Sequence, residues 1–379
     1  MWQTKKLGEL CDIKTGKKDV NQGNPTGMYP FFTCARDHTY SDEYSFDTEA
    51  LLVAGNGDVG HVSYYKGKFE AYQRTYVISD FKGISPRLLF LFLDGFLKDT
   101  VSKQKLGNTM PYIKMGMLTE FEVPVPPLAD QKIIVKKLDE IFEKVAKAKA
   151  NAEKNLQNSK ELFESYLQSV FAKPGKDWEE KKLGSLTSKI GSGATPRGGK
   201  ESYIKEGISL VRSMNVHDRS FVEKNLAFID DKQAKDLANV TLEKGDVLLN
   251  ITGASITRSC VFPDKYLPAR VNQHVSIIRP LSEVIDSIFL NYLLTSKLHK
   301  DRLLVIGGQG ATRQAITKAQ LENFSVSLPK SLVGQRAIVK KLDALSTETK
   351  KLEKIYRQKL TALEELKKSI LKKAFAGEL

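Results

Sequence analysis

The sequence lacks the features of a secreted, membrane-spanning or metal-binding protein. Its 379 residues include only three cysteines, Cys11, Cys34 and Cys260, which have no ligand spacing. An odd, scattered set of cysteines is typical of a reducing compartment. The most apolar run, residues 88–93, is far shorter than the ~18 residues of a membrane-spanning helix. No basic-then-apolar signal opens the chain, so we expect a soluble, cytoplasmic protein.

The sequence also contains no complete catalytic or nucleotide-binding motif. Residues 55–60 have the pattern GxGxxG, but an alternating strand follows where a dinucleotide site requires a helix, so we expect a hairpin turn. Ala194 and Glu201 stand where a phosphate loop requires a glycine and a hydroxyl residue. The five histidines have no metal spacing. We therefore expect no catalytic residue, cofactor or metal on this chain.

Charge is distributed unevenly. The chain has 59 basic and 45 acidic residues, a formal charge of +14, which favours a polyanionic partner. Residues 1–127 hold 15 basic and 15 acidic side chains, whereas residues 173–331 hold 24 and 17. If the partner is nucleic acid, the first part of the chain must place its basic groups by geometry.

An internal repeat organises the chain. The run Ile-Val-Lys-Lys-Leu-Asp occurs at 134–139 and again at 338–343, and Trp-x-x-Lys-Lys-Leu-Gly occurs at 2–8 and again at 178–184. The order is therefore body, long helix, body, long helix. We expect four segments, namely a first body at 1–127, a first long helix at 128–173, a second body at 174–329 and a second long helix at 330–379.

The two long segments have the pattern of a coiled coil. Apolar or small residues recur at steps of three and four from Ile134 to Val170, through Tyr166, and from Ile338 to Ile370, through Leu366. Each helix is about 40 residues, roughly 60 Å long. So long and narrow a stripe needs a partner, and the other copy is the nearest. Connectivity allows parallel or antiparallel pairing; a two-fold relation favours antiparallel. A helical hairpin that only props up two domains is the plainer alternative.

The two bodies combine short strands, turns and a few helices. The expected strands are 49–54, 61–65 and 71–78 in the first body, and 245–251 and 270–278 in the second. The expected helices are 86–98 and 287–301. Gln73 and Gln273 then occupy matching places, while the polar loops differ. The predicted fold class is α+β: two mixed α/β bodies separated by a pair of long antiparallel coiled-coil helices, with a pseudo-two-fold internal repeat. One scaffold with different loops suggests two related sites for two targets.

Several segments resemble the specificity subunits of type I restriction–modification enzymes. They are Pro-Pro-Leu-x-x-Gln at 126–131 with the repeat that follows it, Gln335 with the second copy, Ser-Gly-Ala-Thr-Pro at 192–196, Val-Asn-Gln-His at 271–274 and the closing Ala-Phe-Ala-Gly-Glu-Leu at 374–379. The resemblance covers nearly the whole chain, in the right order. In the first body, residues 14–18 and 72–74 stand in place of the second body's 192–196 and 272–274.

The resemblance implies a non-catalytic DNA reader. Each body would be a target-recognition domain for one half of a split, double-stranded DNA sequence, and the paired helices would hold the halves apart. Two methylation subunits would dock on the helices and supply S-adenosylmethionine and adenine methylation. A restriction subunit can join such a complex.

Base-edge readout requires Arg, Lys, Asn and Gln on loops, while phosphate contacts fix the register. The candidates in the first body are Arg36, His38, Asn56, Arg74, Lys103, Lys105, Asn108, Tyr112 and Lys114. Those in the second are Arg197, Arg212, Asn215, His217, Arg258, Gln273, His274, Gln309, Thr312, Arg313 and Gln314. Two other functions stay open from the residues alone: a nucleic-acid-modifying enzyme that works unaided, and a coiled-coil assembly protein without a DNA role.

Overall fold

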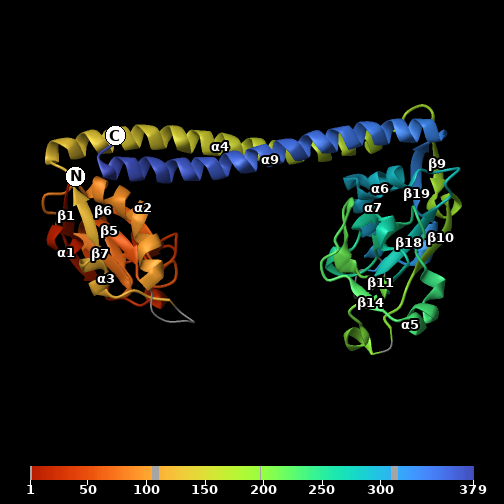
Figure 1. Cartoon of the computed structure of the whole chain (residues 1–379), viewed down its shortest axis with the longest axis horizontal. Coiled ribbons are helices and arrows are strands. Elements are labelled where there is room, and N and C mark those ends of the chain that lie inside the picture. The colour runs from red at the N-terminus through yellow and green to blue at the C-terminus, as the bar shows by residue number, and fades with distance from the viewer. Residues whose placement is uncertain (1, 105–110, 197, 309–314) are drawn as a thin grey trace. The chain divides into compact units, whose positions relative to one another are not determined.

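The computed structural model describes residues 2–104, 111–196, 198–308 and 315–379. By its internal contacts the chain divides into two units (Figure 1), Met1–Lys154 with Arg357–Leu379, and Asn155–Tyr356. Each unit contains one body and the portions of the two long helices that pack on it. This division cuts both helices, and the four-segment division stays a prediction about domains. In the described part of the chain, no helix is long and apolar enough to cross a membrane.

The first unit is built on a six-stranded sheet with the order β2-β7-β5-β6-β3-β4. A separate pair, β1-β8, joins the two ends of the body. The strands are β1 (Gln3–Lys6), β2 (Asp12–Thr15), β3 (Tyr29–Phe32), β4 (Thr39–Ser41), β5 (Phe46–Ala54), β6 (Val62–Ala71), β7 (Thr75–Ser79) and β8 (Glu122–Val125). The helices are α1 (Leu7–Leu10), α2 (Pro86–Gln104) and α3 (Met115–Thr119).

The second unit repeats this plan in smaller sheets. Its central sheet has the order β10-β18-β15-β16, and β9-β19 joins the ends of the body. The strands are β9 (Trp178–Lys182), β10 (Thr187–Ser192), β11 (Ile208–Val211), β12 (Val216–His217), β13 (Ser220–Phe221), β14 (Ala227–Ile229), β15 (Val247–Asn250), β16 (Ser259–Val261), β17 (Ala269–Val271), β18 (Val275–Pro280) and β19 (Ser325–Pro329). The helices are α5 (Asp231–Asp236), α6 (Ser287–Thr295), α7 (Lys297–Gly307) and α8 (Lys318–Glu322).

The predicted repeat is confirmed strand by strand. The order β2-β7-β5-β6 in the first unit corresponds to β10-β18-β15-β16 in the second, with antiparallel pairing throughout. The residues 55–60 turn the chain between β5 and β6, as expected for a hairpin, so the GxGxxG pattern opens no helix. The helix expected over 287–301 is two helices, because Ser296 adopts an extended conformation between α6 and α7.

Two expected strands are interrupted at the same place in the two bodies. Residues 71–78 comprise the end of β6, a turn at Gln73–Arg74 and then β7. Residues 270–278 comprise β17, a turn at Gln273–His274 and then β18. In the second body the carboxamide of Asn272 accepts the His274 N–H (3.1 Å), which closes the turn. The matching glutamines therefore lie on exposed turns rather than within strands.

The long helices α4 (Leu128–Ala172) and α9 (Leu332–Ala376) have 45 residues each. In the first unit Lys149 pairs with Glu364 (2.6 Å), and the Lys367 ammonium lies 5.5 Å from the centroid of the Phe142 ring. Residue numbers thus fall along α4 as they rise along α9, so the pairing there is antiparallel, as predicted. Figure 1 shows the two ribbons side by side.

The predicted seam is wrong near the carboxyl end of each helix. Tyr166 and Leu366 are 36% and 46% exposed, whereas Leu167 and Leu371 are buried in the cores of the bodies. A straight α-helix drifts from a seven-residue repeat. The apolar side therefore turns away from the helix–helix seam and onto the adjacent body.

A buried glutamine fixes the first turn of each long helix to its body. The Gln131 carboxamide accepts the Ser85 N–H (2.7 Å) and donates to the carbonyls of Gly83 (3.0 Å) and Pro126 (2.9 Å). Gln335 repeats the arrangement with the Asp286 N–H (2.9 Å) and with the Val284 and Pro329 carbonyls (3.0 and 3.1 Å). Both side chains are almost inaccessible to water, so they satisfy backbone groups that would otherwise be buried unpaired.

The aspartate that ends each Ile-Val-Lys-Lys-Leu-Asp run also binds its body, through different partners. Arg87 of α2 donates to Asp139 Oδ1 from Nε (3.2 Å) and Nη2 (2.7 Å). The Tyr292 hydroxyl of α6 donates to Asp343 Oδ1 (2.6 Å). Burial, followed by this hydrogen bond, raises the pKa of Tyr292.

Replacing Gln131 with leucine should destabilise the first unit by about 2–4 kcal/mol, because three hydrogen bonds are lost and their backbone partners stay buried. Denaturant unfolding measures the loss, and amide exchange of the segment with Ser85 localises it. Lys132→Ala, at the exposed neighbouring position, is the matched control and should change little. Equal stability of the two variants would contradict a structural role for the Gln131 carboxamide.

Candidate nucleic-acid interface

The candidate site of the first body lies at the carboxyl end of β5, where four loops meet. The Gly55 N–H donates to the Arg74 carbonyl (3.0 Å), and the Ile113 N–H donates to the Gly55 carbonyl (2.9 Å). The Asp58 N–H donates to the Cys34 carbonyl (3.1 Å). These bonds bring together the loops at 33–38, 55–61, 72–75 and 111–114, which carry most of the predicted residues of this body.

The charged side chains of these loops are available to a ligand. Arg36 and Arg74 are exposed, and neither guanidinium has a hydrogen bond or ion pair with any residue that the structure describes. The ring of His38 lies 5.3 Å from that of Phe32, and so keeps a fixed place on the loop. Lys98 binds the Asp58 carboxylate, and this hydrogen bond lowers the pKa of Asp58. The carboxylate of the glycine turn is therefore engaged inside the protein.

The Gln73–Arg74 turn is fixed from the side of β2. The Gln73 N–H donates to the Lys18 carbonyl (3.0 Å), and its carboxamide Nε2 donates to Asp19 Oδ2 (3.2 Å). Gly16 makes this approach possible, because a Cβ there would lie 1.9 Å from the Ala71 carbonyl oxygen. Gln73 therefore has a defined position although it is exposed.

The second body builds the corresponding site at the end of β15. The Ile251 N–H donates to the His274 carbonyl (3.0 Å), and the Ile316 N–H donates to the Ile251 carbonyl (2.9 Å). The Thr252 hydroxyl lies 2.6 Å from His274 Nδ1, so the imidazole is held through one nitrogen. The Thr195 hydroxyl donates to Gln273 Oε1, which holds the glutamine in the manner of Gln73.

A groove of about 830 Å³ opens beside this turn. It is lined by His274, Arg258, Ser213, Met214 and Ala315, with the loop 252–255. Arg258 is half-buried there, and its guanidinium has no hydrogen bond or ion pair with any described residue. The groove therefore presents an unpaired guanidinium and an oriented imidazole, which can donate hydrogen bonds to base edges and phosphates.

The remaining candidates differ in their burial and in their hydrogen-bond partners. Asn215 is fully buried, and its amide binds the Arg212 N–H (3.1 Å) and the Val222 carbonyl (2.8 Å). The Asn215 amide thus stabilises the backbone of its own body, and a contact between Asn215 and DNA stays a prediction. Arg212 lies over the Tyr203 ring and donates to the Asn225 carbonyl, so it is largely occupied.

Other predicted residues keep varied positions. Asn56 is buried with 9% exposure, Tyr112 and His217 are half-buried, and Lys103 and Lys114 are exposed. The candidates that lie outside the described residues are Lys105, Asn108, Arg197, Gln309, Thr312, Arg313 and Gln314. Among the residues that are described, no three His, Cys, Asp or Glu side chains come together as metal ligands.

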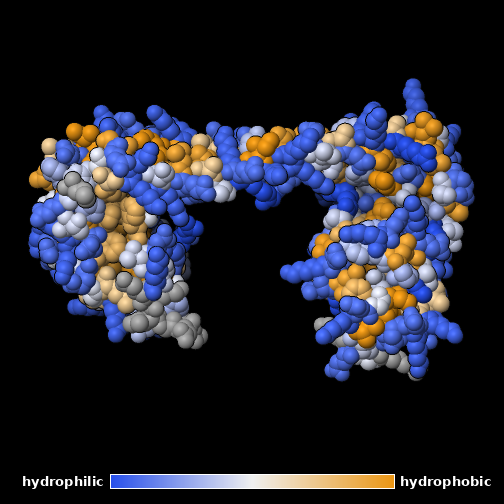
Figure 2. Space-filling view, viewed as in Figure 1, coloured by the Kyte–Doolittle hydropathy of each residue, from blue (hydrophilic) through white to orange (hydrophobic). Residues whose placement is uncertain are grey.

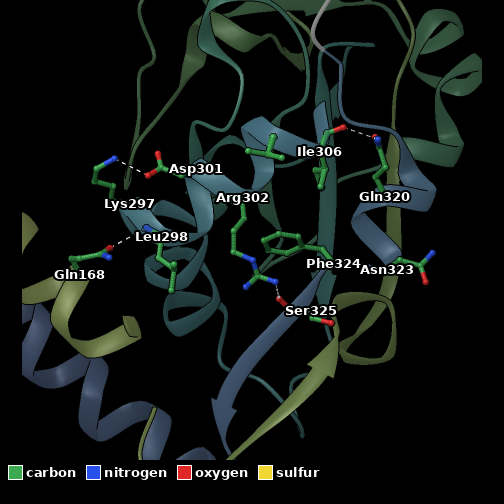
Figure 3. A pocket seen from close by; sticks show the side chains of 11 residues that line it. Gln168, Lys297, Leu298, Asp301, Arg302, Ile306, Gln320, Asn323, Phe324 and Ser325 are labelled. Carbon is green, nitrogen blue, oxygen red and sulfur yellow. Dashed lines mark hydrogen bonds and ion pairs between the residues drawn. The ribbon is translucent and has the colours of Figure 1, made fainter. Parts of the chain in front are cut away.

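A second concavity of the same unit, of about 640 Å³, lies beside α7 and α8 (Figure 3). The Arg302 guanidinium lies 4.9 Å from the centroid of the Phe324 ring and donates to the Ser325 carbonyl (2.9 Å). Gln168 accepts the Leu298 N–H (3.0 Å). Because Arg302 and Gln168 are engaged with neighbouring groups of the protein, they are not free to act on a bound molecule. The pocket therefore resembles an apolar groove more than a reaction centre.

Similarity to known proteins agrees with this arrangement of two related sites. Residues 1–156 and 175–362 match the family described as the type I restriction modification DNA specificity domain. The chain belongs to this family. The assignment confirms the resemblance seen in the sequence and, with it, a role in DNA recognition.

Three curated relatives show the extent of the similarity. The EcoDI specificity subunit of Escherichia coli is 39% identical over 180 residues, 47% of this chain but 39% of that subunit. The EcoBI specificity subunit of Escherichia coli is 27% identical over 96% of this chain and 79% of its own length. The MjaVIII specificity subunit of Methanocaldococcus jannaschii is 25% identical over 100% of this chain and 93% of its own length.

Two solved structures share the fold. One is a chain from a structure described as the basis of complex assembly and conformational transition of the type I R-M system. It is 20% identical to this chain, with a TM-score of 0.78 over all of this chain and 98% of that chain. The other is the HsdS subunit from Thermoanaerobacter tengcongensis, with 19% identity and a TM-score of 0.59 over all of this chain and 97% of that chain. At these identities the likeness concerns the fold alone, and it agrees with the predicted α+β class.

One residue that lies beside the candidate site is not among the predicted residues. His61 follows the glycine turn and was assigned to a strand, yet its carbonyl accepts the Ala54 N–H (3.0 Å) at the end of β5. Its ring Nε2 lies 3.3 Å from the Ser63 hydroxyl. Aligning the two bodies on the strand that precedes each glycine turn would have placed His61 opposite a loop residue of the second body.

Replacing Gly193 with alanine tests whether the close approach beneath the Gln273–His274 turn is required. A Cβ at this position would lie 1.7 Å from the Val271 carbonyl oxygen, so the backbone must move, at a cost of about 1–3 kcal/mol. We expect a lower thermal midpoint for the second unit and weaker DNA binding. Gly191→Ala, whose Cβ meets nothing within 4 Å, is the matched control. Similar losses in both variants would show that the close approach is unimportant.

Proposed function

We propose that this chain is the sequence-recognition subunit of a type I restriction–modification complex and reads a bipartite DNA site, one body per half-site. The observation that carries the proposal is the repeated arrangement at the ends of β5 and β15. The same backbone hydrogen bonds present different polar side chains there, Arg74 in one body and His274 in the other. Two backbone arrangements that match but carry different side chains are suited to recognising two different base sequences.

The chemistry of the exposed groups supports duplex DNA as the ligand. Guanidinium groups bind guanine edges in pairs of hydrogen bonds, and glutamine amides bind adenine. Arg74, Gln73 and Gln273 are exposed, and Arg258 lines the second groove. The formal charge of +14 favours phosphate contacts, which position a protein on DNA without reading its sequence.

We propose further that α4 and α9 set the separation of the two half-sites and bind two methylation subunits. Each helix runs for 45 residues without interruption. Figure 2 shows apolar side chains in patches along the helices. The exposed apolar residues of α4 and α9 include Ile133 (56%), Leu162 (51%) and Ile355 (53%). Apolar side chains exposed on an otherwise charged helix are suited to a protein partner.

Catalysis, in this proposal, belongs to the partners. The polar side chains that the two sites offer include Arg74, Arg258 and His274, whose donors would hold DNA. The methylation subunits would supply S-adenosylmethionine and transfer its methyl group to adenine, and a restriction subunit can join the same complex. The chain itself would bind, orient and select the DNA.

Reconstitution with the methylation subunits tests the function. We expect methylated adenines only within one bipartite sequence, bound at least ~10³-fold more tightly than unrelated DNA at physiological salt. The purified chain alone, incubated with labelled S-adenosylmethionine and DNA, is the control and should transfer no methyl group. Transfer by the chain alone would support a stand-alone enzyme. Absence of any DNA binding at low salt would support an assembly protein.

Shortening the helices tests the spacer. Removing seven residues from the middle of α4 and the seven that face them in α9 keeps the antiparallel pairing and shortens each helix by about 10 Å. We expect the methylated sequence to keep both half-sites but to change the number of unread base pairs between them. Sequencing of methylated DNA measures the spacing, and an unchanged spacing would contradict the proposal.

A further inference from the structure

The end of the central strand carries the same arrangement of five residues, joined by three backbone hydrogen bonds, in both bodies. In the first body the Ala54 N–H donates to the His61 carbonyl (3.0 Å), and the Gly60 N–H donates to the Ala54 carbonyl (2.9 Å). The next residue, Gly55, donates its N–H to the Arg74 carbonyl (3.0 Å). His61 and Arg74 therefore flank the last residues of β5, His61 from the side of β6 and Arg74 from the side of β7.

The second body makes these bonds with other residues. The Asn250 N–H donates to the Arg258 carbonyl (2.8 Å), and the Thr257 N–H donates to the Asn250 carbonyl (2.8 Å). Ile251 then donates its N–H to the His274 carbonyl (3.0 Å). Arg258 and His274 therefore flank the end of β15, from the sides of β16 and β18.

The correspondence extends to an unusual backbone conformation. The residue before His61 is Gly60, with φ +79°, and the residue before Arg258 is Thr257, with φ +71°. Glycine adopts this conformation freely, whereas a β-branched residue does so only when its surroundings impose it. Thr257 is buried, and it is the Asn250 hydrogen bond that holds it there. The direction of Arg258 is thus fixed by the fold of the second body.

We infer that His61 and Arg74 in the first body, and Arg258 and His274 in the second, are equivalent two-residue base-reading sites in which arginine and histidine have exchanged places. This inference rests on the proposed function. The residue pair is the same in both bodies and its order across the central strand is reversed. His61 is thereby assigned to DNA reading, a role that its place in the sequence did not suggest.

The side chains around each pair support this assignment. Arg74 and Arg258 have no hydrogen bond or ion pair with any described residue, so both guanidinium groups are free to bind DNA. The imidazoles are held through neighbouring hydroxyls, His274 Nδ1 by Thr252 (2.6 Å) and His61 Nε2 by Ser63 (3.3 Å). In each body one side chain has free donors and the other has a fixed orientation.

The hydrogen-bonding groups of arginine and histidine indicate which base pairs each two-residue site selects. A guanidinium binds the O6 and N7 acceptors of guanine through two hydrogen bonds, which makes it selective for a G·C pair. An imidazole that is held through one ring nitrogen offers only the other to a base, and so distinguishes bases less strongly. Each half-site should therefore contain a G·C pair under the arginine, with the neighbouring pair under the histidine. Because the order of arginine and histidine is reversed, the G·C pair should lie on opposite sides of the histidine contact in the two half-sites.

The test exchanges the pair in the reconstituted methylation complex. The double variant His61→Arg/Arg74→His should alter the sequence preference of the first half-site, by about tenfold or more at the G·C position, and leave the second half-site unchanged. The reciprocal variant Arg258→His/His274→Arg should alter the second half-site alone. Sequencing of methylated adenines reads both outcomes, and Lys66→Ala, an exposed position away from the site, is the control.

Two further results would overturn the inference. Equal loss of methylation on all sequences would make these residues phosphate contacts, and unchanged preferences at both half-sites would exclude them from reading. If an exchange variant does not fold, Arg258→Lys and His61→Gln replace it; Arg258→Lys keeps the charge but loses the paired hydrogen bonds, so selectivity for G·C should still fall. A wild-type complex that methylates no bipartite sequence would instead refute the proposed function.

Discussion

A buried carboxamide in each body fixes the place at which a long helix begins. From the first turn of their helices, Gln131 and Gln335 each bind three backbone groups: two in the loop before α2 or α6 and one in the segment that leads into the long helix. The helix must therefore leave the body at a fixed place. Buried side chains further along it, Leu138 and Leu342 among them, then join the core of the same body. The sites at β5 and β15 are supported by cores to which the long helices themselves contribute.

Sequence patterns predicted the features that repeat. The duplicated run at 134–139 and 338–343 located the long helices, and the tight approach of Gly16 and Gly193 explains why Gln73 and Gln273 occupy matching places. The turns that hold these glutamines were not predicted, because residues 71–78 and 270–278 contain no proline or glycine, and three consecutive polar residues in each (73–75 and 272–274) are a weak signal for a turn. Closure of the turn depends on bonds from distant loops, which no local pattern contains.

The residues of the candidate site were likewise predicted only in part. Residue type and loop position selected Arg74 and His274, which the fold brings to equivalent places, and Arg258, which lines the same groove as His274. They did not show that the Asn215 amide is used inside the protein, and the sequence pattern places His61 in a strand. A polar side chain on a loop can serve a ligand or its own backbone, and only the hydrogen-bond partners distinguish the two.

Asp139 and Asp343 have different partners, an arginine and a tyrosine, so the two attachments of the helices differ in their sensitivity to ionic strength. The Arg87–Asp139 contact is an ion pair between side chains that are each 41% exposed, so dissolved salt screens it. The Tyr292–Asp343 contact has only one formal charge and lies in a half-buried place, where ions act weakly. Rising ionic strength should therefore loosen one attachment before the other, which makes a symmetric repeat respond asymmetrically to its surroundings.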